Sequence, residues 1–480
     1  MPGSHFSNLP AKQVESLRST VLDLLANHGV MLDQHPEMFE LLSQAGAQVD
    51  VESRMVRFPK PVMERLLESA PKAFTLGARN QEKTLRLPRP EGGFYTRTGT
   101  GSHGWIDPET GTYRKVTKAD LAQWAGLINH LDQIDFLPYL YADDVPVQTA
   151  DIHGLHTLLV NSDKHIWVQP YSTDSIPYLL QMAETIAGEQ AALKSNPVIS
   201  MIACSLTPRT FKTMDIEVIL QAVRASVPIH ACSLPGAGGT APATTAGVML
   251  LTVAEILAMV AMAQAVSPGT PVVACPIIFS TDMQTGRSLQ SSVGALKGAS
   301  GAVQLIKAAF NLPTHNYGSG TDSAHVGRQS QAERSMLTTL MALSGSDILG
   351  GAGQLEVATA VSPLQLIIDN EVFAMARQLV AGFAFDADHL ALEVIAETDP
   401  GQHFLTAEHT LRHCRDGFRP ALFSSATHED WLREGKKGLL DKALEAYQDL
   451  IMQENRCRLA EGMKMELDAI LTNADSQLAG

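Results

Sequence analysis

The sequence predicts an α/β protein of the (β/α)8 class, a TIM barrel, with an N-terminal helical extension and a C-terminal helical tail. From about residue 118 onward, short apolar strands alternate with helical patterns, which is typical of parallel β-α-β units. Seven such strands are visible, and an eighth near residues 94–117 or past residue 381 would complete a barrel. A doubly wound open sheet would need a phosphate-binding turn, and neither GxGxxG nor GxxxxGK(S/T) occurs.

Apolar runs and the breaks between them place each element. The predicted strands are 137–145, 165–171, 197–204, 228–233, 271–279, 313–317 and 347–353. The predicted helices are 118–131, 149–161, 173–187, 210–226, 246–266, 286–309, 329–344 and 363–381. The Gly-rich stretch 235–240 follows a strand but has no P-loop lysine, so a flexible loop is favoured over a phosphate cradle.

The regions before and after this alternation differ from it. Residues 1–90 are predicted to form a helical lead-in, with helices at 14–28, 36–45 and 61–70 and a short strand at 51–58. We predict the catalytic barrel at 91–400 and the tail at 401–480. Within the tail, 438–471 is an amphipathic helix or helix pair, which we expect to pack on the body or on another subunit.

Composition excludes some classes of function. The chain has 480 residues, a formal net charge of −15 and a pI of about 5.5, so nonspecific binding to nucleic acid is not expected. Five cysteines without a CxxC pair indicate a reducing compartment. The N-terminal MPGSHFSNLPAKQ has neither an apolar core nor a cleavage signal, so we expect a cytoplasmic protein.

The segment 246–266 is almost as apolar as a membrane span, but Glu255 lies in its middle. An unpaired carboxylate at a bilayer centre is costly, and no basic flank sets an orientation. We therefore predict no membrane span but a helix buried inside the protein, in which Glu255 is paired or hydrogen-bonded.

Candidate functional groups gather at strand ends and in one loop. Residues 312–333, LPTHNYGSGTDSAHVGRQSQAE, read as a strand end, a Gly-rich loop and a helix start; a long polar loop that binds nothing is the alternative. This stretch supplies His315, Tyr317, Asp322, Gln329 and Glu333. Other strand ends and loops contribute Tyr95, Arg97, His103, Asp143, Gln169, Tyr171, Cys204, Cys232, Cys275 and Glu356.

Several standard catalytic patterns are missing. There is no HExxH, and His153 with His156 fits a helix surface better than a metal site, so we predict no metal centre. A zinc site built from the scattered strand-end cysteines is the weaker alternative. No GxSxG elbow is present. A Schiff-base lyase or aldolase would need a lysine at a strand end, and Lys164 and Lys307 precede their strands.

The ordered series of short motifs resembles the trimethylamine methyltransferase (MttB-like) superfamily over nearly the whole chain. The motifs that carry the resemblance are Val56-Arg57-Phe58-Pro59, Asp144-Val145-Pro146, Ser205-Leu206-Thr207-Pro208, Gly239-Thr240-Ala241-Pro242, Ala254-Glu255, Thr321-Asp322, Gln329 to Glu333 and GQHFL at 401–405. The family has GHFL at the last of these. No single motif is specific, whereas their order along the chain is.

This resemblance implies a (β/α)8 barrel that moves a methyl group from an amine to the cobalt of cob(I)alamin on a separate corrinoid protein. The archaeal trimethylamine enzymes of the family use pyrrolysine, and every residue here is a standard one. We expect the pyrrolysine position to fall within 321–333, at or near Gln329. The resemblance therefore points to the non-pyrrolysine branch and to quaternary amines, with glycine betaine as the first candidate.

Roles for single residues follow as hypotheses. Part of an aromatic cage for the ammonium would come from Tyr95, Trp167, Tyr171, Phe279 or Tyr317, and a counter-charge from Asp143, Asp322 or Glu356. If the substrate has a carboxylate, Arg97, His103, Arg328 or His403 would hold it. His315 and Gln329 complete the predicted substrate site. Each role has a structural alternative. The aromatic residues could serve only as core, Asp143 could cap a helix, and His403 could bridge the tail to the barrel.

The remaining alternatives concern substrate and activity. Proline betaine, carnitine, choline or γ-butyrobetaine could replace glycine betaine in the same reaction. A non-catalytic barrel that binds a small cation is the alternative from another class of protein. We expect a homo-oligomer that docks a cognate corrinoid protein.

Overall fold

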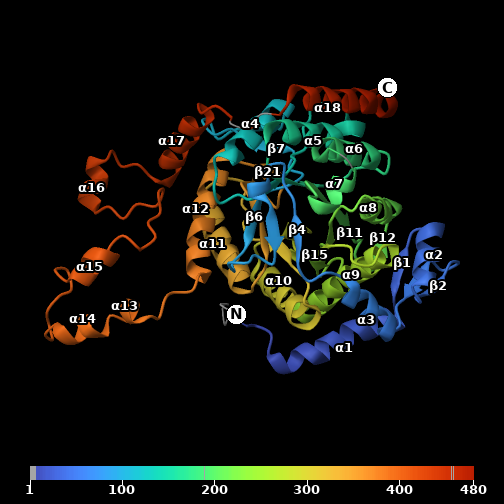
Figure 1. The fold of residues 1–480 in the computed structure, drawn as a ribbon, viewed down its shortest axis with the longest axis horizontal. Coiled ribbons are helices and arrows are strands. Elements are labelled where there is room, and N and C mark those ends of the chain that lie inside the picture. Colours follow the sequence, from blue (N-terminus) through green and yellow to red (C-terminus); the bar gives the residue numbers. More distant parts are fainter. Residues whose placement is uncertain (1–6, 189, 456, 458) are drawn as a thin grey trace.

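The computed structural model describes residues 7–188, 190–455, 457 and 459–480. Part of the N-terminal stretch on which the expectation about export rests, residues 1–6, lies outside this description. The centre of the molecule is a barrel of eight parallel strands (Figure 1). The strands are β6 (Tyr95–Thr98), β9 (Phe136–Pro138), β10 (His165–Val168), β11 (Ile199–Cys204), β13 (Ile229–Ser233), β15 (Val272–Pro276), β18 (His315–Tyr317) and β19 (Ile348–Ala352).

Neighbouring barrel strands pair in chain order. The order β15-β13-β11-β10-β9-β6-β19-β18 runs around the barrel, and a parallel bridge between Ala274 and Thr314 joins its two ends. The predicted (β/α)8 fold is therefore confirmed. The eighth strand is β6, at the start of the 94–117 region. The sequence had left open whether this strand lies there or past residue 381.

Helices cover the outside of the barrel (Figure 1). They are α4 (Lys118–Asn129), α5 (Ala150–Asn161), α6 (Ile176–Ala187), α7 (Gln190–Ser195), α8 (Thr213–Arg224), α9 (Thr245–Val266), α10 (Val293–Leu305), α11 (Arg328–Leu343) and α12 (Pro363–Val380). The strands β9, β10, β15 and β19 are shorter at their C-terminal ends than predicted, whereas β11, β13 and β18 end at the predicted residues. After Pro138, for example, the chain leaves β9 for a loop, because apolar residues such as Tyr139 and Leu140 are buried without continuing the ladder.

Helix α9 is the one helix in the described part of the chain that is long and apolar enough to cross a membrane, and 83% of its apolar window is buried inside the protein. It packs against α1, α3 and α10 on one side and β13 and β15 on the other. Glu255 is fully buried and accepts hydrogen bonds from the hydroxyls of Ser205, Thr207 and Ser233 and from the backbone N–H of Arg209. The predictions of a buried helix and of a hydrogen-bonded Glu255 are both confirmed.

The N-terminal region combines helices with small sheets. Helices α1 (Ala11–Asn27), α2 (Pro36–Gln44) and α3 (Lys60–Ser69) match the prediction. The predicted strand at 51–58 is shorter, as β3 (Met55–Arg57), and pairs with β1 (Val30–Leu32) and β2 (Gln48–Asp50). A polar turn at 51–54 separates β2 from β3. The lead-in is thus a helix-and-sheet layer, and α1, α2 and α3 cover α9.

The predicted turn at Asp107 lies in an antiparallel hairpin, β7 (Gly104–Ile106) with β8 (Tyr113–Lys115). Asp107 accepts hydrogen bonds from the backbone N–H groups of Glu109 and Thr110, which closes the turn. The hairpin extends a small sheet with β20 (Gln354–Leu355) and β21 (Ala360–Val361), the two short strands that follow β19. Because β7 follows β6 and β20 follows β19, this sheet continues from the C-terminal ends of those two barrel strands.

After α12 the chain has two contrasting parts. Residues 381–438 form an arm that projects from the barrel and carries α13 (Ala387–Leu390), α14 (Leu392–Glu397), α15 (Glu408–His413) and α16 (His428–Arg433) (Figure 1). The chain then returns as two helices, α17 (Leu439–Ile451) and α18 (Glu461–Ala474). The predicted helix pair therefore packs on the body, α17 against α12 and α18 against α5 and α6.

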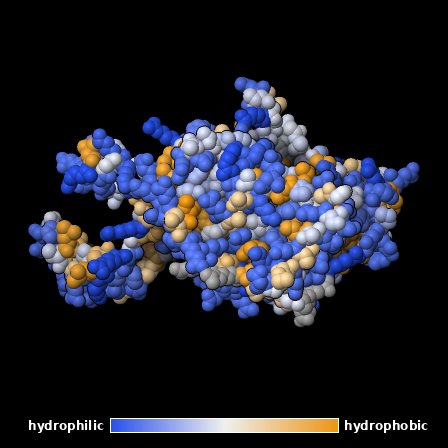
Figure 2. All heavy atoms as spheres, turned by 90° about the horizontal axis from the view of Figure 1, so that it is seen from above, coloured by the Kyte–Doolittle hydropathy of each residue, from blue (hydrophilic) through white to orange (hydrophobic). Residues whose placement is uncertain are grey.

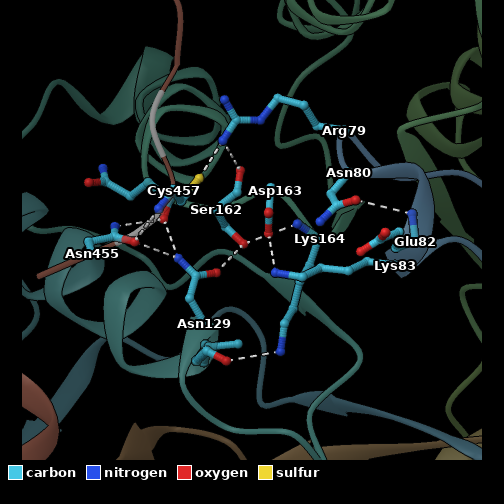
Figure 3. A network of polar contacts seen from close by, with 12 residues as sticks. Arg79, Asn80, Glu82, Lys83, Asn129, Ser162, Asp163, Lys164, Asn455 and Cys457 are labelled. Atoms are coloured by element: carbon cyan, nitrogen blue, oxygen red, sulfur yellow. Dashed lines mark hydrogen bonds and ion pairs between the residues drawn. The ribbon is translucent and has the colours of Figure 1, made fainter. Parts of the chain in front are cut away.

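Side-chain contacts fasten the returning segment to the barrel (Figure 3). Asn129 donates to Asn455 Oδ1 at 3.0 Å, and Asn455 donates to the carbonyl of Asn161 at 3.0 Å. The Arg79 guanidinium contacts Cys457 Sγ and also donates to the carbonyl of Ser162. Asn161 and Ser162 come shortly before β10, so this part of the tail packs at the N-terminal end of the barrel, opposite to the expected site.

Candidate functional site at the barrel axis

A buried arginine lies inside the barrel near the C-terminal strand ends. Arg97, the third residue of β6, is fully buried. Gly350 on β19 makes room for it, because a Cβ at that position would lie 2.6 Å from Arg97 Cζ. The guanidinium lies over the ring of Trp167 at 4.2 Å and near the ring of Tyr317 at 5.4 Å.

Arg97 has no carboxylate partner among the described residues. Its Nη1 donates to the carbonyl of Thr98 at 2.7 Å and its Nε donates to His315 Nε2 at 2.7 Å. Its Nη2 is buried and makes no hydrogen bond to any residue that the structure describes. Burial lowers the pKa of Arg97, and the neighbouring Tyr317 and Cys275 oppose that shift. A buried cation without a counter-ion is unusual in a folded protein, which marks this place for an anion.

Three histidines continue from Arg97 through the barrel interior. His315 Nδ1 lies 3.2 Å from His230 Nδ1, His230 Nε2 lies 3.1 Å from Ser200 Oγ, and Ser200 Oγ lies 2.8 Å from His165 Nε2. His165 Nδ1 then donates to the carbonyl of Gly77 at 2.7 Å. Burial lowers the pKa of all three histidines, that of His165 to about 4, so each imidazole is neutral at pH 7.

The hydrogen bonds at the two ends of this histidine series, to Arg97 and to the carbonyl of Gly77, assign the tautomer of each imidazole. His315 accepts from Arg97 at Nε2, so its proton is on Nδ1 and points to His230. His230 then donates through Nε2 to Ser200, which donates to His165. Every contact has one donor and one acceptor. Several imidazoles can therefore be buried without charge at the axis.

The same tautomers bear on a possible metal centre. His230, Cys275 and His315 place three potential ligand atoms within 4.8 Å of one another. A metal at this place would need the lone pair of His315 Nδ1, and Nε2 would then carry a proton facing the N–H of Arg97. The charge of Arg97 also repels a cation. The residues present therefore suit an anion and not a metal ion.

Three strand-end cysteines lie side by side. Cys204, Cys232 and Cys275 are in register on β11, β13 and β15, and none forms a disulfide. The pKa of Cys204 is well above its usual value because of the contact with Cys232 and burial, and burial raises the pKa of Cys232 likewise. Cys204 and Cys232 are therefore neutral thiols at pH 7, whereas metal binding requires thiolates.

The central loop uses its own polar groups to hold its shape. Glu333 accepts hydrogen bonds from the hydroxyl of Thr321, the backbone N–H of Asp322 and the side chain of Gln329. Asp322 accepts from the backbone N–H groups of Gln290 and Ser291, and burial raises its pKa. Gln329 is exposed at the start of α11. The loop lies beside the axis, but Asp322 and Gln329 are engaged in fixing it.

Glu356 lies in an unusual turn next to this loop. Glu356, Val357 and Ala358 have φ angles of 47°, 52° and 69°, a left-handed run of three residues that are not glycine. The N–H groups of Glu356 and Val357 donate to the carbonyls of Ser323 and Thr321. The turn is therefore strained and held by the central loop. Glu356 itself contacts Arg287 at 3.4 Å.

A tyrosine-lined pocket lies at the rim of the barrel, after β9 and β10. This rim pocket, of about 390 Å³, is lined by Tyr141, Val147, Gln148, Tyr171, Ser172, Asp174 and Leu478. The rings of Tyr141 and Tyr171 are 5.6 Å apart, and Tyr139 packs against Tyr171 at 5.9 Å. Aromatic faces with a carboxylate beside them can bind a small cation.

The other predicted site residues lie elsewhere. Tyr95 is the first residue of β6, at the opposite barrel end, where its hydroxyl accepts from the backbone N–H of Arg86. Asp143 is exposed, and its neighbour Asp144 accepts from the N–H of Lys118 at the start of α4. Phe279 is half-buried in β16 (Phe279–Thr281), after β15. His403 is exposed on the arm.

The candidate Schiff-base lysines are both engaged near the starts of strands. Lys164 Nζ donates to the carbonyls of Ile128, Leu131 and Ile134 at the end of α4, and burial lowers its pKa to about 8. Lys307 Nζ bonds both carboxylate oxygens of Asp347 at 2.7 Å. Neither amine faces the strand ends at which a barrel enzyme binds its substrate.

The structure thus brings four predicted residues together at the axis: Arg97, Trp167, His315 and Tyr317. Sequence reasoning missed His230, Ser200 and His165. The signal for His230 was available, because the strand IHACS alternates and places His230 on the same face as the strand-end Cys232. The hydrogen-bonded series that joins His315, His230 and His165 could not be predicted from the sequence pattern, because these residues are far apart in the sequence.

A closed (β/α)8 barrel with buried polar groups beneath its C-terminal mouth belongs to a class of barrels that is largely enzymatic. A family model described as trimethylamine methyltransferase (MTTB) matches residues 3–478. The chain therefore belongs to the trimethylamine methyltransferase (MTTB) family, as its motifs had indicated, and it is a methyltransferase.

Named relatives are similar over most of the chain. Trimethylamine methyltransferase MttB of Desulfitobacterium hafniense (strain DSM 10664 / DCB-2) is 28% identical over 437 residues, covering 90% of this chain and 87% of the relative. Glycine betaine methyltransferase of Desulfitobacterium hafniense (strain Y51) is 28% identical over 434 residues, covering 89% of each. Among solved structures, the monomethylamine methyltransferase MtmB of Methanosarcina barkeri has a TM-score of 0.49 and 13% identity, covering 91% of this chain and 92% of that one.

Proposed function

We propose that this protein transfers a methyl group from a carboxylated quaternary amine, with glycine betaine as the first candidate, to cob(I)alamin carried on a separate corrinoid protein. The observation that carries the proposal is Arg97, a buried guanidinium between aromatic faces with an unpartnered Nη2. The two named relatives are equally similar to this chain, at 28% identity each, so the choice of substrate rests on chemistry.

A quaternary amine suits a site with neutral groups. Its leaving group is a neutral amine, so departure needs no general acid, whereas trimethylamine must first become cationic to donate a methyl group. Cobalamin, when bound, would supply a nucleophilic cobalt(I). Attack on a cationic methyl donor by an anionic nucleophile reduces charge, and a dry site favours such a step. The neutral histidines and thiols at the axis fit this requirement.

Arg97 would orient such a substrate. A carboxylate bound to the guanidinium would lie at the inner end of the site, since Arg97 is buried beneath the strand ends. Repulsion from Arg97 would then direct the ammonium away, toward the mouth. Tyr317, at the end of β18, would contact the ammonium, and Trp167 would hold the guanidinium flat. One methyl group would thus face outward to the corrinoid protein.

The same argument ranks the alternative amines. Proline betaine, carnitine and γ-butyrobetaine also carry a carboxylate and fit the proposal by charge. Choline and trimethylamine lack one and would place a cation near Arg97 without compensation. A non-catalytic barrel that binds a small cation is the second candidate, and the rim pocket with Tyr141, Tyr171 and Asp174 is the observation that favours it.

We further propose that the chain consists of an N-terminal lead-in at 1–90, a catalytic barrel at 91–400 and a C-terminal tail at 401–480. We also propose that the protein is a cytoplasmic homo-oligomer. The arm supports the oligomer, because many of its apolar side chains are exposed (Figure 2). The proposed reaction involves neither a membrane nor a nucleic acid as a partner. A cognate corrinoid protein would dock at the C-terminal mouth of the barrel.

The test is methyl transfer to reduced cobalamin, followed by the absorbance change from cobalt(I) to methyl-cobalt(III). The panel is glycine betaine, proline betaine, carnitine, γ-butyrobetaine, choline and trimethylamine. We expect methylation by one carboxylated quaternary amine and none by choline or trimethylamine. Tight binding of a cation in calorimetry without methyl transfer would favour the binding protein instead.

The matched variants are Arg97→Met and Arg224→Met, the latter exposed on α8. Arg97→Met should lower kcat/KM for the active betaine by roughly 100-fold, as expected for loss of a buried charged partner, while Arg224→Met retains it. Circular dichroism would verify that both variants fold. Wild-type turnover by a folded Arg97→Met protein would contradict the carboxylate role.

A further inference from the structure

The arm has no hydrophobic core of its own. No described residue between 381 and 438 is buried, although its helices carry large apolar residues such as Phe385, Leu405 and Leu411. Short segments that cannot bury apolar surface usually need a covalent or metal staple to hold a single shape. The contacts that hold α13 against α15 are polar and converge on one cluster.

That cluster joins Asp388 of α13 to His409 and His413 of α15. His413 Nε2 lies 3.0 Å from Asp388 Oδ2, and His409 Nε2 lies 2.9 Å from the carbonyl oxygen of Asp388. His409 and His413 are four residues apart, so their side chains share one face of the helix. One potential ligand atom from each of the three residues lies within 4.8 Å of the others.

The imidazoles are already gathered and oriented. The ring centroids of His409 and His413 are 4.4 Å apart, and the ring of His389 is 5.3 Å from that of His413. His413 Nδ1 contacts Asp416 Oδ2 at 2.6 Å. A carboxylate behind the distal ring nitrogen is the usual support of a metal-binding histidine, because it fixes the tautomer that points a lone pair at the metal.

The hydrogen-bond count at His413 points to a cation. A neutral imidazole that donates through Nδ1 to Asp416 presents a lone pair from Nε2, and the atom facing it is a carboxylate oxygen of Asp388. Two lone pairs repel at 3.0 Å unless a positive species lies between them, either a proton or a metal ion. Arg412 neutralises Asp388 only through the other oxygen, Oδ1, at 2.8 Å.

We propose that Asp388, His409 and His413 bind a divalent transition metal ion, with zinc the best match, which clips α13 to α15. Two imidazole nitrogens and a carboxylate oxygen are ligands that zinc accepts in a tetrahedral site, with water in the fourth position. The site is exposed, so the ion can enter from solvent. This proposal is independent of the methyl-transfer site, since the arm projects away from the barrel (Figure 1).

The experiment is calorimetric titration of chelator-stripped, full-length protein with Zn²⁺. We expect one equivalent to bind to the wild type and none at that affinity to His409→Ala/His413→Ala. Asp416→Asn keeps all three ligands and should weaken zinc binding by about 10- to 100-fold. His428→Ala, an exposed arm histidine on α16, is the matched control and should bind as the wild type does.

Absorption spectra of the Co²⁺-loaded protein test whether the metal binds instead at the buried group of His230, Cys275 and His315. Cobalt bound to nitrogen and oxygen ligands gives weak visible bands, whereas a Cys275 ligand would add a strong thiolate charge-transfer band in the near ultraviolet. We expect no such band and no effect of Cys275→Ser. Wild-type zinc binding by a folded double variant, or loss of binding in Cys275→Ser, would overturn the proposal. Zinc should also slow proteolysis of the arm in the wild type and not in the double variant.

Discussion

The barrel interior and the arm show two ways in which one chain places polar groups. Three imidazoles at the barrel axis and the carboxylate of Glu255 on α9 are fully buried, and each is matched by donors or acceptors from neighbouring segments. On the arm, imidazoles and carboxylates also pair closely, but every one is exposed or half-buried. Burial therefore decides how much each contact is worth, because water competes for the arm contacts and cannot reach those of the barrel.

The largest effect should come from the buried carboxylate of Glu255. Glu255→Leu leaves four donors without an acceptor inside the protein, so we expect a loss of about 3–5 kcal/mol of unfolding free energy. Glu255→Gln should cost less, because its oxygen can accept from the N–H of Arg209 while the two N–H groups of its amide can donate to two of the three hydroxyls. Urea unfolding measures both. Similar losses for the two variants would mean that the charge matters more than hydrogen bonding.

A smaller effect should appear as acid sensitivity of the histidine chain. The pKa of His165 is about 4 in the folded protein and about 6.5 when unfolded, so between these values the unfolded state binds more protons. Stability should fall from pH 6.5 toward 4 by about 1.4 kcal/mol per pH unit for this residue, and His230 and His315 act in the same direction.

The measurement is unfolding free energy against pH for the wild type and two variants. His165→Gln should lower the slope of unfolding free energy against pH by about the contribution of one proton, roughly 1.4 kcal/mol per pH unit. Asp215→Asn should make it steeper, because burial raises the pKa of Asp215 to about 6, so its folded form takes up a proton first and offsets part of the loss. An unchanged slope in His165→Gln would indicate that water reaches the axis.

The smallest effect should come from an apolar residue of the arm. Leu411→Ala removes a side chain that is 76% exposed and should change the unfolding free energy by less than about 0.5 kcal/mol. Leu349→Ala, at a fully buried position of β19, is the matched comparison and should cost about 2–5 kcal/mol. A loss above about 2 kcal/mol for Leu411→Ala would show that another copy of the chain covers the arm in solution.

The order of elements was predictable from local patterns. Apolar runs alternating with helical spacing indicated seven barrel strands, and the outer helices fell close to their predicted ranges because their apolar faces recur with the helical period. The ends of strands were less predictable. Residues such as Tyr139 and Leu140 are apolar because loops bury them, and periodicity alone cannot separate that burial from a strand.

The candidate site divides in the same way. The sequence by itself determined which side chains follow which strand, and hence that Arg97, Trp167, His315 and Tyr317 could meet at one barrel. Only the tertiary structure decided that Arg97 has no carboxylate partner among the described residues, that Tyr95 lies at the opposite end, and that His403 is on the arm. The physical reason is that inward direction and distance depend on strand register and closure, which are set by packing between residues far apart in the chain.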